Sequence, residues 1–156
     1  MPTNGPGPRY QALLALLRAA DVVWNASHAL FARWELSPSQ FNVLNLLSDQ
    51  PAGLTQTELS RALIVHRSNV TGLVDRLTQR GLLARHAAAG DRRAWRVRLT
   101  PAGQRLIREI LPHYYAAAER VWGRVPVTRA RALTSELDAL AQNAEALAAR
   151  ITESQT

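Results

Sequence analysis

Apolar residues in the first part of the chain recur at steps of three and four, which is typical of an amphipathic helix. The positions that carry this pattern, all but two of them apolar, are Tyr10, Leu13, Leu14, Leu17, Asp21, Trp24, His28 and Phe31. They predict a helix over residues 9–34, preceded by a tail over residues 1–8 that we expect to be flexible.

Two helix-start signals follow. In the stretch LSPSQ, Ser37 can cap a helix whose third residue is Gln40, and Thr55 and Glu58 repeat this arrangement before a second helix. A third apolar pattern is formed by Val70, Leu73, Val74 and Leu77, and it ends at Gly81. Two short helices separated only by residues 66–68 predict a helix-turn-helix.

After Gly81 the apolar period changes from 3.6 to 2, which indicates strands. Residues 82–87 predict one strand, and alternation around Trp95, Val97 and Leu99 predicts a second, with these three side chains facing the domain. The loop between them is expected over residues 87–93. A β-hairpin directly after a helix-turn-helix is the wing of a winged helix, so residues 37–100 predict a DNA-binding domain of that type.

The C-terminal part is expected to be helical over residues 101–152, with Pro112 kinking or interrupting the first helix. Its last helix carries apolar residues at alternating steps of four and three, at Leu133, Leu137, Leu140, Ala144, Leu147 and Ile151. One winged domain cannot bury this seam and the 9–34 stripe together, so we expect both segments to form a homodimer. The alternative is a monomer in which the two helices pack on each other.

The predicted fold class is therefore mainly α with a small β-hairpin wing, flanked by N- and C-terminal dimerisation helices. The chain lacks cysteine, apolar runs long enough for a membrane span, and a signal-like N-terminus, which predicts a soluble, cytoplasmic protein.

All 19 basic residues are arginine, and the net charge is +7. Residues 60–108 hold eleven arginines against two aspartates, whereas the rest of the chain has a net charge of −2. A confined basic segment favours a polyanionic partner, although a solvated basic face would look the same.

The predicted recognition helix offers groups suited to double-stranded DNA. Asn69 can bond an adenine edge, Ser68 and Thr71 are small donors, and Gly72 permits close approach. Arg67 and Arg76 are better placed for phosphates. An ordinary polar helix face is the alternative interpretation.

The wing carries a second candidate site. Asp91, Arg92 and Arg93 lie near the predicted tip, where arginine can enter a minor groove and Asp91 can hold a guanidinium extended. Arg96 faces outward and can clamp the DNA backbone. The alternative is a solvated turn with incidental charge.

These residues resemble the MarR family of multiple antibiotic resistance regulators. The resemblance rests on the run from Asp91 to Thr100, which has an Asp-x-Arg tip and a strand ending in Leu-Thr, and on SNVTGLVDRLTQRGLLAR over residues 68–85. It implies a homodimeric transcription regulator, most often a repressor, that binds a near-palindromic operator. It also implies a wing-tip role for Asp91 and Arg93. The absence of cysteine excludes the cysteine-based peroxide sensors of that family.

The resemblance further implies release from DNA by a small anionic or phenolic ligand. Trp24, His28 and Tyr115 are candidates to line its pocket, and plain interface packing is the alternative. The sequence shows no metal-ligand spacing, no cofactor motif and no catalytic motif, so we expect no metal, no cofactor and no enzyme activity. The alternative function is a winged helix for protein contact or non-specific DNA binding, without a ligand response.

Overall fold

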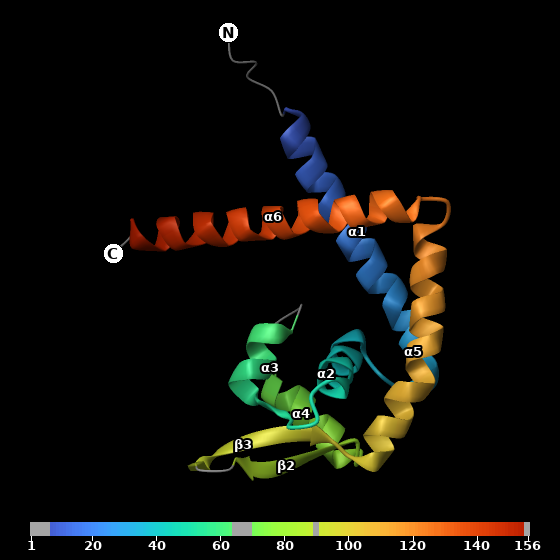
Figure 1. Cartoon of the computed structure of the whole chain (residues 1–156), viewed down its shortest axis with the longest axis vertical. Helices are drawn as coiled ribbons and strands as arrows, with labels where there is room; N and C mark the ends of the chain where they lie inside the picture. Colours follow the sequence, from blue (N-terminus) through green and yellow to red (C-terminus); the bar gives the residue numbers. More distant parts are fainter. Residues whose placement is uncertain (1–6, 64–69, 89–90, 155–156) are drawn as a thin grey trace. The chain divides into compact units, whose positions relative to one another are not determined.

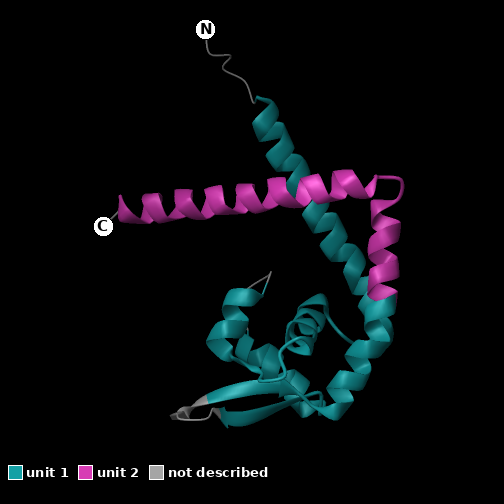
Figure 2. Ribbon diagram, in the orientation of Figure 1, with its two compact units in different colours: residues 1–112 teal, residues 113–156 magenta. Residues whose placement is uncertain are grey.

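The computed structural model describes residues 7–63, 70–88 and 91–154, with the backbone alone at residues 88 and 91–94. Its elements in chain order are α1 (Pro8–Phe31), the 3-10 turn η1 (Ala32–Trp34), α2 (Pro38–Ser48), β1 (Leu54–Thr55), α3 (Gln56–Ala62), α4 (Val70–Gln79), β2 (Leu83–Ala88), β3 (Asp91–Leu99), α5 (Pro101–Trp122) and α6 (Val127–Glu153) (Figure 1). The chain divides into two compact units, residues 1–112 and 113–156 (Figure 2).

The N-terminal helix is attached to the next helix through aromatic packing. The α-helix ends at Phe31, and the three residues expected to extend it form η1 instead. Glu35 follows with a φ of 53°, a left-handed conformation that turns the chain towards α2. The ring of Phe31 stacks on that of Phe41 in α2, with centroids 4.2 Å apart. This stack fixes the C-terminal end of α1 to the first helix of the winged domain.

Both predicted capping boxes are confirmed. The hydroxyl of Ser37 accepts from the Gln40 backbone N–H at 3.2 Å, and the Gln40 side-chain oxygen accepts from the Ser37 N–H at 2.9 Å. Thr55 and Glu58 make the same reciprocal pair at the start of α3. Each pair satisfies two backbone donors that a helix start leaves without a partner.

The core of the winged domain is built from the apolar stripes that the sequence predicts. Buried positions on α2, α3 and α4 are Phe41, Val43, Leu44, Leu47, Leu59, Val70, Leu73, Val74 and Leu77. The sheet adds Leu83 and Val97, and α5 adds Ile107 and Ile110. No polar or charged side chain is buried among the described residues, so the core is held by apolar contact.

The wing has three strands rather than two, in the antiparallel order β1-β3-β2. The third, β1, pairs Leu54 with Val97 and Thr55 with Arg96. Two residues are too few to show an alternating pattern, which is why the sequence indicated only a hairpin. The second hairpin strand is also longer than expected, since Asp91 to Arg93 belong to β3 rather than to a loop.

The prediction that the Trp95 side chain packs against the domain is wrong. Val97 is fully buried, as expected, but the side chain of Trp95 is 55% exposed. Trp95 pairs with Ala87, which is also exposed, and a register shift follows between Ala87 and Ala88. We attribute the exposure to position: this part of the hairpin projects beyond the helices, and no core lies beneath it.

Helix α5 runs from Pro101 to Trp122, and Pro112 does not interrupt it. Its first turn lies against the wing, because Gly103 is buried beside the Leu82 carbonyl group. A Cβ atom at this position would overlap that carbonyl oxygen and would stand 3.2 Å from Cδ2 of Leu99. The Leu82 oxygen also accepts from the Thr100 N–H at 3.0 Å, which restricts any shift of the backbone.

In the second unit, α6 has no buried residue although it is 27 residues long. Its exposed apolar positions include Leu133, Leu140, Leu147 and Ile151. No helix in the described part of the chain is long and apolar enough to cross a membrane.

The close approach at Gly103 leads to a prediction. We expect Gly103→Ala to lower the free energy of unfolding by about 1–3 kcal/mol, because the methyl group needs space that the Leu82 backbone occupies. Urea unfolding followed by circular dichroism, at one protein concentration, measures this change. Gln104→Ala, at an exposed position on the same turn, should change the value by less than about 0.5 kcal/mol. Equal effects of the two substitutions would contradict the steric explanation.

Candidate nucleic-acid interface

Helix α4 has a buried side and an open side. The buried side consists of Val70, Leu73, Val74 and Leu77, none of them more than 5% exposed. On the open side, Thr71 and Arg76 are exposed and Gly72 is half-buried. Arg67, Ser68 and Asn69, which the sequence places before this helix, lie outside the described residues. The described part of α4 therefore presents Thr71, Gly72 and Arg76 together.

An ion pair that the sequence did not predict joins α4 to the wing. The Arg85 guanidinium of β2 bonds the Asp75 carboxylate of α4. Their side chains are 37% and 45% exposed, so the pair contributes at most about 1 kcal/mol to stability. Its effect is orientation, because it fixes the helix against one strand of the hairpin.

Arg80, just beyond the C-terminal end of α4, connects the helix to the N-terminal part of the chain. Its Nη1 donates to the Glu35 carbonyl oxygen at 2.7 Å, and its Nη2 donates to that of Trp34 at 3.0 Å. Trp34 in turn donates through Nε1 to Glu109 of α5 at 2.7 Å. Sequence analysis missed these contacts, because the partners are 46 and 75 positions apart and two of the acceptors are backbone groups.

Strand β3 begins with Asp91, Arg92 and Arg93. The structure describes the backbone of these three residues but not their side chains. They therefore lie at the start of a strand. Their predicted role at a minor groove concerns side chains that lie outside what is described, and it stays a prediction.

Arg96 has internal partners that strand alternation could not predict. Its Nη2 donates to the Gly53 carbonyl oxygen at 2.8 Å, its Nε donates to that of Ala52 at 3.2 Å, and its guanidinium stands 3.3 Å from the Glu58 carboxylate. The guanidinium thus joins β3 to the loop before β1 and to α3. These bonds explain its position without DNA, and its predicted role as a backbone clamp remains untested.

Gly53 makes this junction possible. Its φ is +74°, and a Cβ atom there would come within 2.5 Å of both the Val97 carbonyl oxygen and Cγ of Arg98. Arg98 also donates from Nε to the Ala52 oxygen at 3.0 Å. The loop therefore approaches β3 more closely than a residue with a side chain would permit.

The pKa of Glu58 is lowered by residues of the same junction. Hydrogen bonds from the backbone and the side chain of Thr55 lower the pKa of its carboxyl group, and the nearby charges of Arg96 and Arg61 lower it further. Burial raises the pKa, with an effect smaller than that of either hydrogen bond but larger than that of either arginine. The carboxylate is thus favoured in the folded protein.

The three residues expected to line a ligand pocket lie in different units. On α1, the rings of Trp24 and His28 meet edge to face with centroids 6.3 Å apart. Tyr115 belongs to the second unit, where its ring lies 6.2 Å from that of Tyr114 and is largely exposed. The structure brings together the first two residues and describes Tyr115 separately.

Comparison with known proteins supports the resemblance to the MarR family. A family model described as the MarR family matches residues 34–94. The transcriptional repressor MprA of Escherichia coli K12 is 31% identical over 114 residues, which cover 69% of this chain. The match spans 65% of the length of that relative.

Two solved structures have the same fold over most of the chain. A MarR-family transcriptional regulator from Rhodococcus sp. RHA1 superposes with a TM-score of 0.77 at 25% identity, covering 88% of this chain and 96% of its own. BpsR of Bordetella bronchiseptica, whose DNA binding is regulated by 6-hydroxynicotinic acid, gives a TM-score of 0.77 at 27% identity. The match covers 88% of this chain and 98% of BpsR. The winged helix-turn-helix with terminal helices is thereby confirmed.

The lowered pKa of Glu58 predicts a pH dependence. A carboxyl group whose pKa is lower in the folded than in the unfolded protein stabilises the fold at neutral pH. That contribution is lost as the pH falls through the folded-state pKa. We therefore expect Glu58→Gln to destabilise the protein at pH 7 and to have little effect near about pH 3.

Urea unfolding at both pH values gives the difference between the wild type and this variant. Glu119→Gln is the control, because Glu119 is an exposed glutamate of α5 without an ion pair among the described residues. A Glu58→Gln effect of equal size at both pH values would show that the charge makes no contribution.

Proposed function

Since this chain belongs to the MarR family of winged helix-turn-helix transcription regulators, we propose that it is a homodimeric, sequence-specific DNA-binding repressor that acts in the cytoplasm. Members of this family are transcription regulators rather than enzymes. The related MprA is itself named a transcriptional repressor. In this proposal residues 37–100 bind the DNA, and residues 9–34 and 101–152 form the dimer.

The observation that carries the proposal is the pairing of α4 with an arginine-rich wing in one compact unit. Burial of the α4 stripe leaves the opposite side open, as a helix entering a major groove requires. The segment from residue 60 to 108 has a strong excess of arginine, which attracts phosphate. The two features together favour a binding mode in which α4 and the wing contact two adjacent grooves of one duplex.

Each candidate residue has a proposed role in that binding mode. Asn69, Ser68 and Thr71 contact base edges in the major groove, where Gly72 lets the helix approach closely. Arg67 and Arg76 contact phosphates. Arg92 and Arg93 reach the minor groove with Asp91 holding one guanidinium extended, and Arg96 supports the wing beside the backbone.

A homodimer accounts for the apolar surface that the chain leaves open. Helix α6 buries none of its residues, yet its apolar positions follow a heptad spacing. On α1, Tyr10, Leu13 and Leu17 are at least 42% exposed. A second copy can cover such stripes, and two-fold symmetry would set the two recognition helices about 34 Å apart, one turn of DNA.

A small effector is part of the proposal as well. The regulation of BpsR by 6-hydroxynicotinic acid supports a ligand-controlled DNA affinity. Trp24, His28 and Tyr115 are the proposed contacts, and packing between subunits remains the alternative role of these side chains.

The first test concerns the wing. We expect Arg93→Ala to weaken binding to a selected duplex by about 1–3 kcal/mol, or roughly 5- to 150-fold in Kd, because it removes one charged groove contact. Arg124→Ala, which removes the same charge outside the basic segment, is the matched control. Fluorescence anisotropy at several salt concentrations gives both affinities.

The same titration on a scrambled duplex separates specific from non-specific binding. A specific regulator prefers the selected duplex by orders of magnitude. Equal affinity for the two duplexes would favour a non-specific coating protein, and no affinity for either would favour a protein-interaction module. Wild-type affinity in Arg93→Ala would remove that residue from the interface.

The second test concerns the dimer. We expect Leu140→Asp to raise the dimer Kd by about tenfold or more, because each carboxylate would be buried without a partner in the seam. Gln142→Asp adds the same charge on the opposite side of α6. Sedimentation equilibrium over a range of concentrations measures both. Equal dimer Kd values for the two variants, or a monomeric wild type, would rule out the seam as the interface.

A further inference from the structure

The most exposed tryptophan of the chain lies on the wing. Trp95 is 55% exposed, whereas Trp34 is buried, Trp24 is half-buried, and Trp122, at 38%, belongs to the second unit. The Trp95 indole has neither a hydrogen bond nor a ring contact within the described chain. A large apolar ring with an unused Nε1 donor is therefore available to a partner of the winged domain.

The strand register shows which face of the sheet carries this ring. Arg85 pairs with Val97, and Ala87 pairs with Trp95, one such pair nearer the end of β2. Side chains two positions apart on a strand point to the same side, so these four residues share one face. Val97 is buried and Arg85 bonds Asp75 of α4, so this face is turned toward α4. Trp95 lies on it about 7 Å further along the strand, where the sheet is no longer covered.

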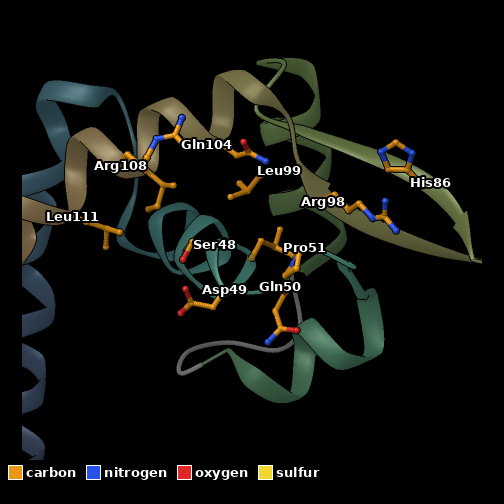
Figure 3. Close-up of a pocket in the computed structure, with 12 residues that line it drawn as sticks. Ser48, Asp49, Gln50, Pro51, His86, Arg98, Leu99, Gln104, Arg108 and Leu111 are labelled. Carbon is orange, nitrogen blue, oxygen red and sulfur yellow. The ribbon is translucent and has the colours of Figure 1, made fainter.

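The alternate positions of the same strands lie on the other face. His86 pairs with Arg96, and Arg98 follows two positions later in β3. Figure 3 shows His86 and Arg98 beside a cavity of about 590 Å³, which Gln104 and Arg108 of α5 also line. His86 is exposed as well, so each face of the hairpin carries an open ring, and His86 can serve as a reference for Trp95.

The surroundings of Trp95 favour a polyanionic partner over an apolar protein surface. Residues 92–98 hold four arginines and no acidic residue. Between residues 37 and 100, Trp95 is the one exposed large apolar side chain that the structure describes, so it does not belong to an apolar patch. An aromatic ring within a run of arginines is typical of surfaces that bind nucleic acid.

The proposed binding mode brings a sugar–phosphate backbone next to this ring. In that mode α4 occupies the major groove and Arg93 the adjacent minor groove, and one backbone separates the two grooves. Trp95 stands between these contacts, two positions from Arg93 and two from Val97, whose cross-strand partner Arg85 bonds α4. The ring therefore faces the backbone between the grooves rather than a base edge.

We infer that Trp95 contacts this sugar–phosphate backbone, with its ring against deoxyribose and Nε1 donating to a phosphate oxygen. An indole suits such a surface, because deoxyribose offers apolar C–H groups and phosphate offers acceptors. The contact carries no base information, so it positions the wing on the duplex and does not select the sequence. The inference rests on the proposed function, since it requires a duplex bound by α4 and the wing.

The test uses the full chain and a fluorescein-labelled duplex that the wild type selects from a random pool. Fluorescence anisotropy gives Kd for the wild type and three variants. We expect Trp95→Ala to raise Kd by about tenfold or more, as truncation of a buried tryptophan contact does. Trp95→Phe should raise it less, because only the Nε1 donor is lost, and His86→Ala should leave it unchanged. Circular dichroism confirms that the variants are folded.

Two further measurements separate a backbone contact from other roles of the ring. Trp95→Ala should keep the wild-type dependence of Kd on salt concentration, since no charge is removed, whereas Arg93→Ala should lower the slope by about one. Replacing single phosphates by methylphosphonate removes the proposed acceptor of Nε1. We expect at least one position where this replacement weakens binding of the wild type clearly more than binding of Trp95→Phe.

The outcomes distinguish this inference from the proposed function. A wild type that binds the selected and a scrambled duplex equally, or binds neither, contradicts both. A wild type that prefers the selected duplex, together with a Trp95→Ala variant of the same affinity, overturns the inference alone. Equal losses in Trp95→Ala and His86→Ala do so too, as does the absence of any methylphosphonate position that separates the wild type from Trp95→Phe. A changed preference among single-base-pair variants in Trp95→Ala would assign the ring to a base instead.

Discussion

The burial of one stripe of α4 is the constraint on which the rest of the winged domain depends. Val70, Leu73, Val74 and Leu77 must be covered, and α2, α3 and the wing provide the cover. Because the four residues occupy a single face, the opposite face is left without packing. Stability and the proposed function are therefore coupled: the contacts that hold the helix determine which side chains it could present to the proposed DNA partner. Thr71 and Arg76 are exposed for this reason.

Four arginines of the basic segment have bonding partners within the described chain. Arg80, Arg85, Arg96 and Arg98 bond backbone carbonyl groups or Asp75, and so they position α4 and the wing. Their partners are mostly neutral carbonyl oxygens, so the positive charge of the segment is held in place with little compensation. A guanidinium with several donors can make such structural bonds and still contribute to the field that attracts a polyanion. The charge of the segment is thus compatible with both roles, and the count of arginines alone does not distinguish them.

The sequence was sufficient for those parts of the fold that depend on neighbours in the chain. The capping boxes at Ser37 and Thr55 and the α4 stripe are local patterns that span four to eight residues, and the structure contains them all. Contacts between positions far apart in the chain could not be predicted from the sequence. The β1–β3 pairing depends on a left-handed turn at Gly53, and the internal bonds of Arg96 depend on that pairing. The exposure of Trp95 was missed because alternation indicates which side a residue faces but not whether a core lies there.

Helix α5 is attached to the rest of the first unit at two points. Its first turn is pressed against Leu82 at Gly103, Glu109 accepts from Trp34, and the same helix continues past Pro112 into the second unit. The residues that line the cavity at Gln104 and Arg108 lie between these two attachments. A helix held at both points resists bending, since packed elements transmit displacement rather than absorb it.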